Sequence, residues 1–483
     1  MKKQVNRKKT KRKFEERLLL ISPPVYDYRL EWAKWHHPTG LLQLASYLKK
    51  QKKDVRLIDC LYFKQGTRLS RQKVGSAEIQ GYTFNKWHFG LSFEELEGRI
   101  KIYIAEGWIP KTVYVTTLNS IWWESAVETI KRVKQLLPKA RIVLGGAYPT
   151  VHYDHAKEYS GADEIIKGVF AKAAKLSPDL SLYEETPYST GIYFYNYSPV
   201  IYKDAKRKIK PRAVSSIVKE IKQKSKMGVR EFLFFDEEIR AEDREHFGEL
   251  LDKVADAELG AHFVLPGNVS PKFITQDLAK KIKRAKVKQI YLRCDLNWGL
   301  ETVKYSTSLA DYERCVTALT KYGGFKPRDG NLAAMLVAGF PEEGLDNVTE
   351  RLMHLAHSVG SVMVVPFQYV PNGYTNSAIK RALSQNGHFS PEGFNSKVFP
   401  LARYSGKSLE EYLDLMRLAS LLNSKYRSKT FDFLGDSLTA QMFRESISTR
   451  GWDPFKEKPL SHTVEAKITT VLDLPVIASA GDR

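Results

Sequence analysis

Short runs of β-branched and aliphatic residues alternate with segments of helical periodicity, and this alternation constrains the fold of the 483-residue chain more than any other feature. In the first part of the chain the pattern predicts strands at 17–22, 54–58, 112–116 and 141–144, with helices at 39–50 and 123–137. Strands and helices that alternate in this way predict an α/β domain with a mainly parallel sheet and helices on both faces. Ligands of such sheets bind beyond the carboxyl ends of the strands.

A second series of the same kind follows in the middle of the chain. A helix at 213–226 precedes expected strands at 231–235, 261–265, 289–292, 333–337 and 363–370. Repeated βα units close, or partly close, a TIM-type (β/α) barrel whose site lies at the carboxyl rim of its strands. Outside these series, we expect 64–110 to be irregular apart from a helix at 93–105, 171–188 to be a linker, and 381–483 to be polar and mostly helical.

Composition limits the class of protein. Hydrophobic residues make up 43% of the chain, enough for large packed cores. The three cysteines, Cys60, Cys294 and Cys315, lie far apart without metal-site or redox spacing, which fits a reducing compartment. No apolar run is long enough to span a bilayer, and the one after the basic start is too short for a signal peptide. We therefore expect a cytoplasmic protein without a membrane span.

The formal net charge is +21, and part of it is concentrated in residues 1–16, where we expect a disordered basic tail. Such a tail can contact nucleic acid or another anionic partner, or it can act only as a solubilising arm. The sequence contains no zinc finger or RNA-binding aromatic motif that would support nucleic-acid binding. Both interpretations of the tail stay open. The basic residues concerned are Lys2, Lys3, Arg7, Lys8, Lys9, Lys11, Arg12 and Lys13.

Several motifs of the first series, in this order, resemble the Rossmann-like cobalamin-binding domain of cobalamin-dependent radical-SAM enzymes. They are Leu20-Ile21-Ser22-Pro23-Pro24, His37-Pro38-Thr39-Gly40, Val113 to Ser120, Leu144-Gly145-Gly146-Ala147-Tyr148, and Gly161-Ala162-Asp163 with Gly168. The resemblance implies a corrin across the carboxyl edge of the sheet, with its nucleotide tail in a slot within the domain. It points to these cofactor-binding positions: Pro23, Pro24, Thr39, Gly40, Thr116, Thr117, Asn119, Ser120, Gly145, Gly146, Tyr148 and Gly168.

A cobalt ligand is a separate question. His37 stands three residues before Gly40, as in the methylmutase-type motif Asp-x-His-x-x-Gly. Trp35 occupies the Asp position of that motif, so His37 is either a cobalt ligand or an ordinary residue at the entry to a helix.

The second series resembles the radical-SAM partial barrel of the same family. The matching strand ends are Phe234 to Glu237, Leu292 to Asp295, Leu336 to Glu343 and Tyr369 to Thr375. The resemblance implies that Asp236, Glu237 and Asp295 lie near SAM, with Asp236 and Glu237 as proton-transfer candidates. It also predicts a cobalamin-binding domain at 17–170, the linker at 171–188, the barrel at 189–380 and a C-terminal helical region from 381 onward.

One motif of the family is missing. Its Cys-x-x-x-Cys-x-x-Cys sequence, which holds a [4Fe-4S] cluster, would begin just after residue 191, where Ile192, Asn196 and Pro199 occupy the three cysteine positions. Ile and Pro have no donor atom and Asn is a poor ligand, so we do not expect a cluster here. Nearby aromatic residues, namely Tyr193, Phe194, Tyr195 and Tyr197, would fill the vacated volume as core packing or form a patch that binds a substrate or partner.

Three functional hypotheses follow. The first is a protein that binds cobalamin, with or without SAM, but has lost radical activity. It would serve an intact radical-SAM enzyme or another subunit as an accessory or corrinoid-binding partner. The second is a methyltransferase that uses cobalamin and SAM in polar chemistry. The third is a nucleic-acid-associated basic protein.

Overall fold

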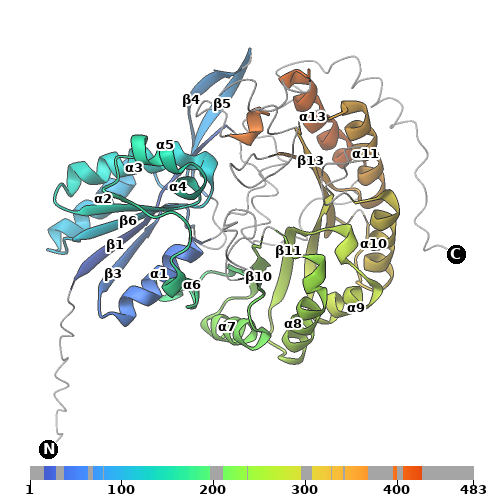
Figure 1. The fold of residues 1–483 in the computed structure, drawn as a ribbon, viewed down its shortest axis with the longest axis horizontal. Helices are drawn as coiled ribbons and strands as arrows, with labels where there is room; N and C mark the ends of the chain where they lie inside the picture. The colour runs from blue at the N-terminus through green and yellow to red at the C-terminus, as the bar shows by residue number, and fades with distance from the viewer. Residues whose placement is uncertain are drawn as a thin grey trace, which may run out of the picture.

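The computed structural model describes residues 16–28, 37–63, 69–79, 81–195, 210–236, 238–294, 307–327, 329–340, 343–367, 395–399 and 406–426. These residues form a five-stranded parallel sheet, a six-stranded parallel sheet and a small antiparallel sheet. The two parallel sheets stand beside each other, each with its own helices (Figure 1). The predicted α/β fold class is confirmed, whereas the domain boundaries remain a prediction.

The N-terminal parallel sheet has the strand order β3-β1-β6-β7-β8. Because the order reverses between β1 and β6, the carboxyl ends of these two strands border the crevice where open α/β sheets bind ligands. The strands are β1 (Arg17–Ser22), β3 (Asp54–Asp59), β6 (Thr112–Thr117), β7 (Arg141–Gly146) and β8 (Glu164–Ile165).

Alternate residues of these strands build two separate cores. Leu18 and Leu20 of β1 pack with Leu41 and Ala45 of α1 (Thr39–Lys50) on one face of the sheet. Leu19 and Ile21 point to the other face, where α2 (Phe93–Ala105) and α3 (Trp123–Leu136) cover the sheet. This alternation is the ordinary period of a strand, and it fixes the face to which each strand-end residue belongs.

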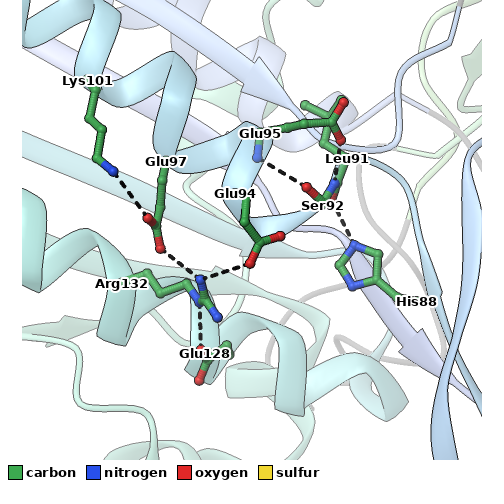
Figure 2. Close-up of polar contacts among 9 residues, drawn as sticks. All are labelled: His88, Leu91, Ser92, Glu94, Glu95, Glu97, Lys101, Glu128 and Arg132. Carbon is green, nitrogen blue, oxygen red and sulfur yellow. Dashed lines mark hydrogen bonds and ion pairs between the residues drawn. The ribbon is translucent and has the colours of Figure 1, made fainter.

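Besides their apolar contacts, the two helices of the second face are linked by Arg132 (Figure 2). Arg132 of α3 donates to Glu97 of α2 at 2.7 Å and to Glu128 of its own helix at 2.7 Å, with Glu94 at 3.7 Å. Ser92 and Glu95 form a capping box that fixes the start of α2. These contacts connect the two helices to each other and fix where α2 begins.

Residues 64–110 were expected to be irregular apart from the helix, and this prediction is wrong. A β-hairpin of β4 (Arg71–Ile79) and β5 (Tyr82–Phe89) pairs with β2 (Val25–Asp27) in an antiparallel sheet. Most of β4 is exposed, so the hydrophobic pattern that marks buried strands is weak there. The hairpin extends toward the C-terminal region, where the Tyr82 hydroxyl donates to Glu410 at 2.6 Å (Figure 1).

The second parallel sheet has its six strands in chain order, as in a partial (β/α) barrel. A mainly apolar cluster, including Leu233, Val264, Tyr291 and Met335, lies on one side of the sheet, and a larger core joins the other side to the helices. The strands are β9 (Ser189–Ile192), β10 (Glu231–Phe234), β11 (His262–Val269), β12 (Val287–Cys294), β13 (Leu332–Ala338) and β14 (Val362–Pro366), and the helices are α7 (Val214–Met227), α8 (Arg244–Asp256), α9 (Gln276–Arg284), α10 (Leu309–Lys321) and α11 (Leu345–Val359).

The C-terminal region contributes α13 (Leu409–Tyr426), which packs on β14 and α11. The Asn423 amide accepts from the backbone N–H of Val362 and donates to its carbonyl, both at 2.7 Å. This helix therefore covers the outer edge of β14, which would otherwise present unpaired backbone groups. The expected strand residues 368–370, the basic tail and most of the expected C-terminal helices lie outside the described residues.

The predicted linker at 171–188 contains the short helix α6 (Ala171–Ala174) and lies against α1. Asp179 accepts from Lys49 at 2.7 Å, and its backbone N–H donates to Leu42. The connection between the two sheets is thus attached to the first domain. Among the residues that the structure describes, no helix is both long and apolar enough to cross a membrane.

Candidate cofactor-binding edge and barrel rim

Three small residues form a row at the carboxyl edge of the N-terminal sheet. Ser22 ends β1, Thr116 lies near the end of β6, and Gly145 pairs with Thr116 in β7. Strand alternation places Ser22 on the face of Leu20, Thr116 on the face of Tyr114, and Gly145 opposite Leu144. All three therefore face the α1 side of the sheet.

This row has open space beside Gly145 and a hydroxyl, that of Ser22, without a hydrogen-bond partner. A Cβ added to Gly145 would meet no described heavy atom within 4 Å. The Ser22 hydroxyl is buried and has no hydrogen-bond partner among the described residues. A buried polar group without a partner costs free energy, so a ligand or water that bonds to it would be favoured.

Gly146, directly after this row, has no room for a side chain. It has φ 95°, and a Cβ there would lie 2.4 Å from the Thr117 carbonyl oxygen and 2.7 Å from the Thr116 hydroxyl oxygen. The Thr117 hydroxyl accepts from the Tyr148 backbone N–H at 2.8 Å. Thr150 donates to the Gly146 carbonyl at 2.6 Å and accepts from the Gly168 N–H at 3.1 Å. Burial raises the pKa of Tyr148, whose hydroxyl lies 2.8 Å from Nδ1 of His155.

The other predicted cofactor positions surround this edge. Pro23 and Pro24 are buried directly after β1. Asn119 accepts from the Ile121 N–H at 3.3 Å and caps a turn that contains the buried Ser120. Thr39 donates to the His37 carbonyl, and Gly40 is exposed in the first turn of α1. The sheet topology thus gathers the predicted positions around one edge.

His37 is surrounded by groups that the sequence did not identify. Its Nδ1 lies 3.1 Å from the Tyr183 hydroxyl and 3.8 Å from Asp59. Tyr183 donates to the same Asp59 oxygen at 2.7 Å, and burial raises the pKa of Tyr183 well above its usual value. This arrangement joins the end of β3 to the segment at 171–188 and orients the His37 ring through its Nδ1.

At the barrel rim, the end of β9 is held by side chains of the protein. Asp236 follows β10 and accepts from the backbone N–H groups of Phe194 at 2.6 Å and Tyr195 at 2.9 Å. The Tyr195 hydroxyl donates to Asp243 at 2.6 Å. Asp236 is 2% exposed, and both of its oxygens are occupied by these amides. Its observed contacts are therefore those of a positioning residue.

A buried ionic group completes this support from the helix side. Glu220 of α7 binds Lys224 at 2.7 Å and Arg212 at 2.6 Å. Lys224 donates to the Gly191 carbonyl at 3.2 Å, and Arg212 donates to the Tyr193 carbonyl at 2.9 Å. Burial lowers the pKa of Lys224 against the opposing effect of Glu220. Burial also raises the pKa of Glu220, but Lys224 and Arg212 outweigh it and the net pKa is lowered.

The aromatic residues after β9 divide between the two sides of the barrel sheet. Phe194 and Tyr195 belong to the helix-side core, and Phe194 packs on Phe247. Tyr193 packs with the inner cluster instead. Phe194 and Tyr195 are therefore core residues, as the core-packing expectation had it, and they do not form a surface patch. Tyr197 lies outside the described residues.

The donor set of the described residues does not fit an iron–sulfur cluster. Ile192 ends β9 with a fully buried side chain and no donor atom. Cys294 and Cys315 lie in the helix-side core, whereas Cys60 lies in the other domain. Within the described ranges no three His, Cys, Asp or Glu side chains are grouped to hold a metal ion. Asn196, Pro199, Glu237 and Asp295 lie outside those ranges.

Glu343, after β13, is a rim residue to which sequence reasoning assigned no role. One carboxylate oxygen accepts from the N–H groups of Gly339 and Phe340, both at 2.8 Å, while the other is buried without a hydrogen-bond partner. Burial raises its pKa to about 7, against the opposing effects of these N–H groups and Arg351. The sequence signal that could have identified Glu343 is its position four residues after Gly339, the glycine at the end of the predicted strand.

A short C-terminal segment, 395–399, connects the two edges. Lys397 forms an ion pair with Asp27, and both side chains are only 3% exposed. Asn395 and Trp122 also donate to Asp27, at 3.2 Å and 3.1 Å. The side chain of Phe399 lies against Gly339 at the barrel rim. This segment was expected to be only part of a polar helical region.

The sequence matches no protein-family model and no curated protein. Solved structures of the radical S-adenosylmethionine methyltransferase TsrM from Kitasatospora setae are similar to this chain. The structure with tryptophan substrate and a SAM analogue has a TM-score of 0.56 and 15% identity, covering 76% of each chain. The structure with cobalamin and a [4Fe-4S] cluster has a TM-score of 0.51 and 14% identity, covering 74% of this chain and 77% of that one. The chain shares with TsrM the fold of a Rossmann-like sheet followed by a partial (β/α) barrel.

Proposed function

We propose that this protein binds a corrinoid at the carboxyl edge of its N-terminal sheet and performs no radical cleavage of SAM. The observation that carries the proposal is the row of Ser22, Thr116 and Gly145 on the α1 side. It combines a buried hydroxyl without a partner, a second hydroxyl and open space beside a glycine. An elongated cofactor tail needs such a slot with few polar anchors.

When bound, a corrinoid supplies a cobalt centre that can accept and hand on a methyl group. Ser22 and Thr116 would hold its tail by hydrogen bonds, and Gly145 would leave space for the tail. The cofactors named for the TsrM structures support this choice of ligand. SAM remains a possible second ligand at the barrel rim, since a SAM analogue is bound in the other TsrM structure.

The barrel rim supports the non-radical part of the proposal. Reductive cleavage of SAM needs a cluster, and Ile192 provides no ligand at the first of the three family positions. Polar methyl transfer with Asp236 as the base gains no support from the geometry, because both oxygens of Asp236 hold backbone amides. We therefore infer a corrinoid-carrying or accessory protein that works with another enzyme or subunit.

The test is the cobalt and iron content per chain after anaerobic reconstitution with hydroxocobalamin, iron and sulfide. We expect about one cobalt and almost no iron per chain, with no reductive cleavage of SAM. Gly145→Leu should abolish cobalt uptake because its side chain fills the slot. Gly98→Leu is the matched control, because Gly98 of α2 also has no neighbour within 4 Å but lies away from this edge.

Two results would overturn the proposal. Stoichiometric iron together with SAM cleavage would restore radical chemistry. The corrinoid assignment would fail if the wild-type protein took up no cobalt, or if Gly145→Leu took up as much cobalt as Gly98→Leu.

A further inference from the structure

The outward face of α7 carries a stripe of lysines that form no ion pair with any described residue. Lys219, Lys222 and Lys226 are all exposed, and their spacing of three and four residues places them on one side of the helix. The acidic residue of α7, Glu220, points inward to Lys224 and Arg212. The exposed side of the helix therefore presents positive charge, spread over about 10 Å of its length.

Some lysines and arginines of other helices are held by carboxylates, in contrast to this stripe. Lys281 and Arg284 of the neighbouring α9 bind Asp252 of α8 at 2.9 Å and 2.7 Å. Lys101 and Arg132 are close to carboxylates of α2 (Figure 2). No ion pair joins Lys219, Lys222 or Lys226 to any carboxylate of the described residues. The stripe is consequently free to contact an external anion.

The chemistry around the stripe limits the kind of anion. The other exposed residues of α7 are Ser215, Ser216, Gln223 and Met227, so the face has no aromatic side chain on which a single-stranded base could stack. A single methionine also offers little apolar surface for insertion into a membrane. Lysines in a line with small polar neighbours suit contacts to regularly spaced phosphates that do not depend on base sequence.

The stripe lies in the middle and last turns of α7, away from the N-terminus of the helix. Its positive potential therefore comes from the lysine side chains and not from the helix dipole, which acts only near the helix ends. We propose that the α7 stripe binds the phosphate backbone of a nucleic-acid duplex.

The test measures binding of the full chain to a fluorescent 20-base-pair RNA duplex between 50 and 200 mM salt, concentrations over which backbone contacts weaken steeply. The variant is Lys219→Gln/Lys222→Gln/Lys226→Gln. Loss of three phosphate contacts should reduce the slope of log affinity against log salt by about 2.7 and weaken binding at least tenfold at the lower salt concentration. This variant, like the control described next, should keep the wild-type melting temperature, because the substituted lysines are exposed.

The matched control is Lys131→Gln/Lys139→Gln/Lys157→Gln, which removes the same charge from exposed positions of the N-terminal domain. We expect this control to bind like the wild type. Both triple variants keep the basic tail, so any contribution of the tail to binding is the same in each. Equal loss in both triple variants would overturn the proposal, because overall charge would then explain binding. The proposal would also be overturned if the wild-type protein bound no duplex. It would be overturned as well if the α7 substitutions weakened binding to polyglutamate or to anionic vesicles but not binding to the duplex.

Discussion

The carboxyl edge of the N-terminal sheet and the end of β9 at the barrel rim are completed in opposite ways. At the N-terminal sheet, the Ser22 hydroxyl lacks a partner and the space beside Gly145 is open. At the barrel rim, the backbone at the end of β9 is bound by Asp236, Arg212 and Lys224. An edge with unused groups is suited to receive a ligand, whereas a strand end whose groups are already paired is stable without one. The comparison shows which of the two places has groups left for a ligand.

The largest expected effect concerns the buried ionic group that supports the end of β9. Glu220→Leu removes the shared partner of Lys224 and Arg212 and leaves the buried Lys224 ammonium without its ion pair. Loss of one partner of a buried ion pair costs about 3–5 kcal/mol of unfolding free energy. Urea denaturation would measure this loss. A change below about 1 kcal/mol would contradict the view that this ionic group supports the end of β9.

The second prediction distinguishes the two adjacent glycines of the N-terminal edge. Gly146→Ala should lower the unfolding free energy by about 2–4 kcal/mol, because the residue has φ 95° and its Cβ would collide with the Thr117 carbonyl. Gly145→Ala should change it by less than about 1 kcal/mol, because no described atom lies near the new Cβ. Thermal or urea unfolding of both variants would check this difference. Equal destabilisation would mean that the space beside Gly145 is already filled.

The smallest expected effect concerns pH and Glu343. Its folded-state pKa of about 7 lies above the unfolded value, so its stabilising effect is full below about pH 4 and disappears as pH rises through 7. Glu343→Gln removes the charge and can still accept from Gly339 and Phe340. We therefore expect this variant to gain about 1–3 kcal/mol relative to the wild type at pH 8 and little at pH 5.

Urea denaturation at the two pH values would measure this gain, with Glu350→Gln on the same α11 as the control for charge. A gain that is equal at pH 5 and pH 8 would contradict the raised pKa of Glu343.

The sequence determined the fold class and much of the N-terminal edge. Strand and helix periodicity depends on neighbouring residues, so β1 and α1 begin and end where the pattern predicted. Parallel topology then gathers strand ends at one edge, which is why Thr116 and Gly145 could be predicted as neighbours. Ile192 could be recognised as a non-ligand from its chemistry alone.

Only the tertiary structure decided which of these polar groups are already paired. Asp236 looks available in the sequence, but it holds amides of a segment about 40 residues earlier. Lys397 and Asp27 form a buried ion pair across 370 positions. The β4–β5 hairpin was missed because its exposed strand lacks a buried pattern. Such contacts depend on long-range packing, whereas sequence periodicity reports only local preference and burial.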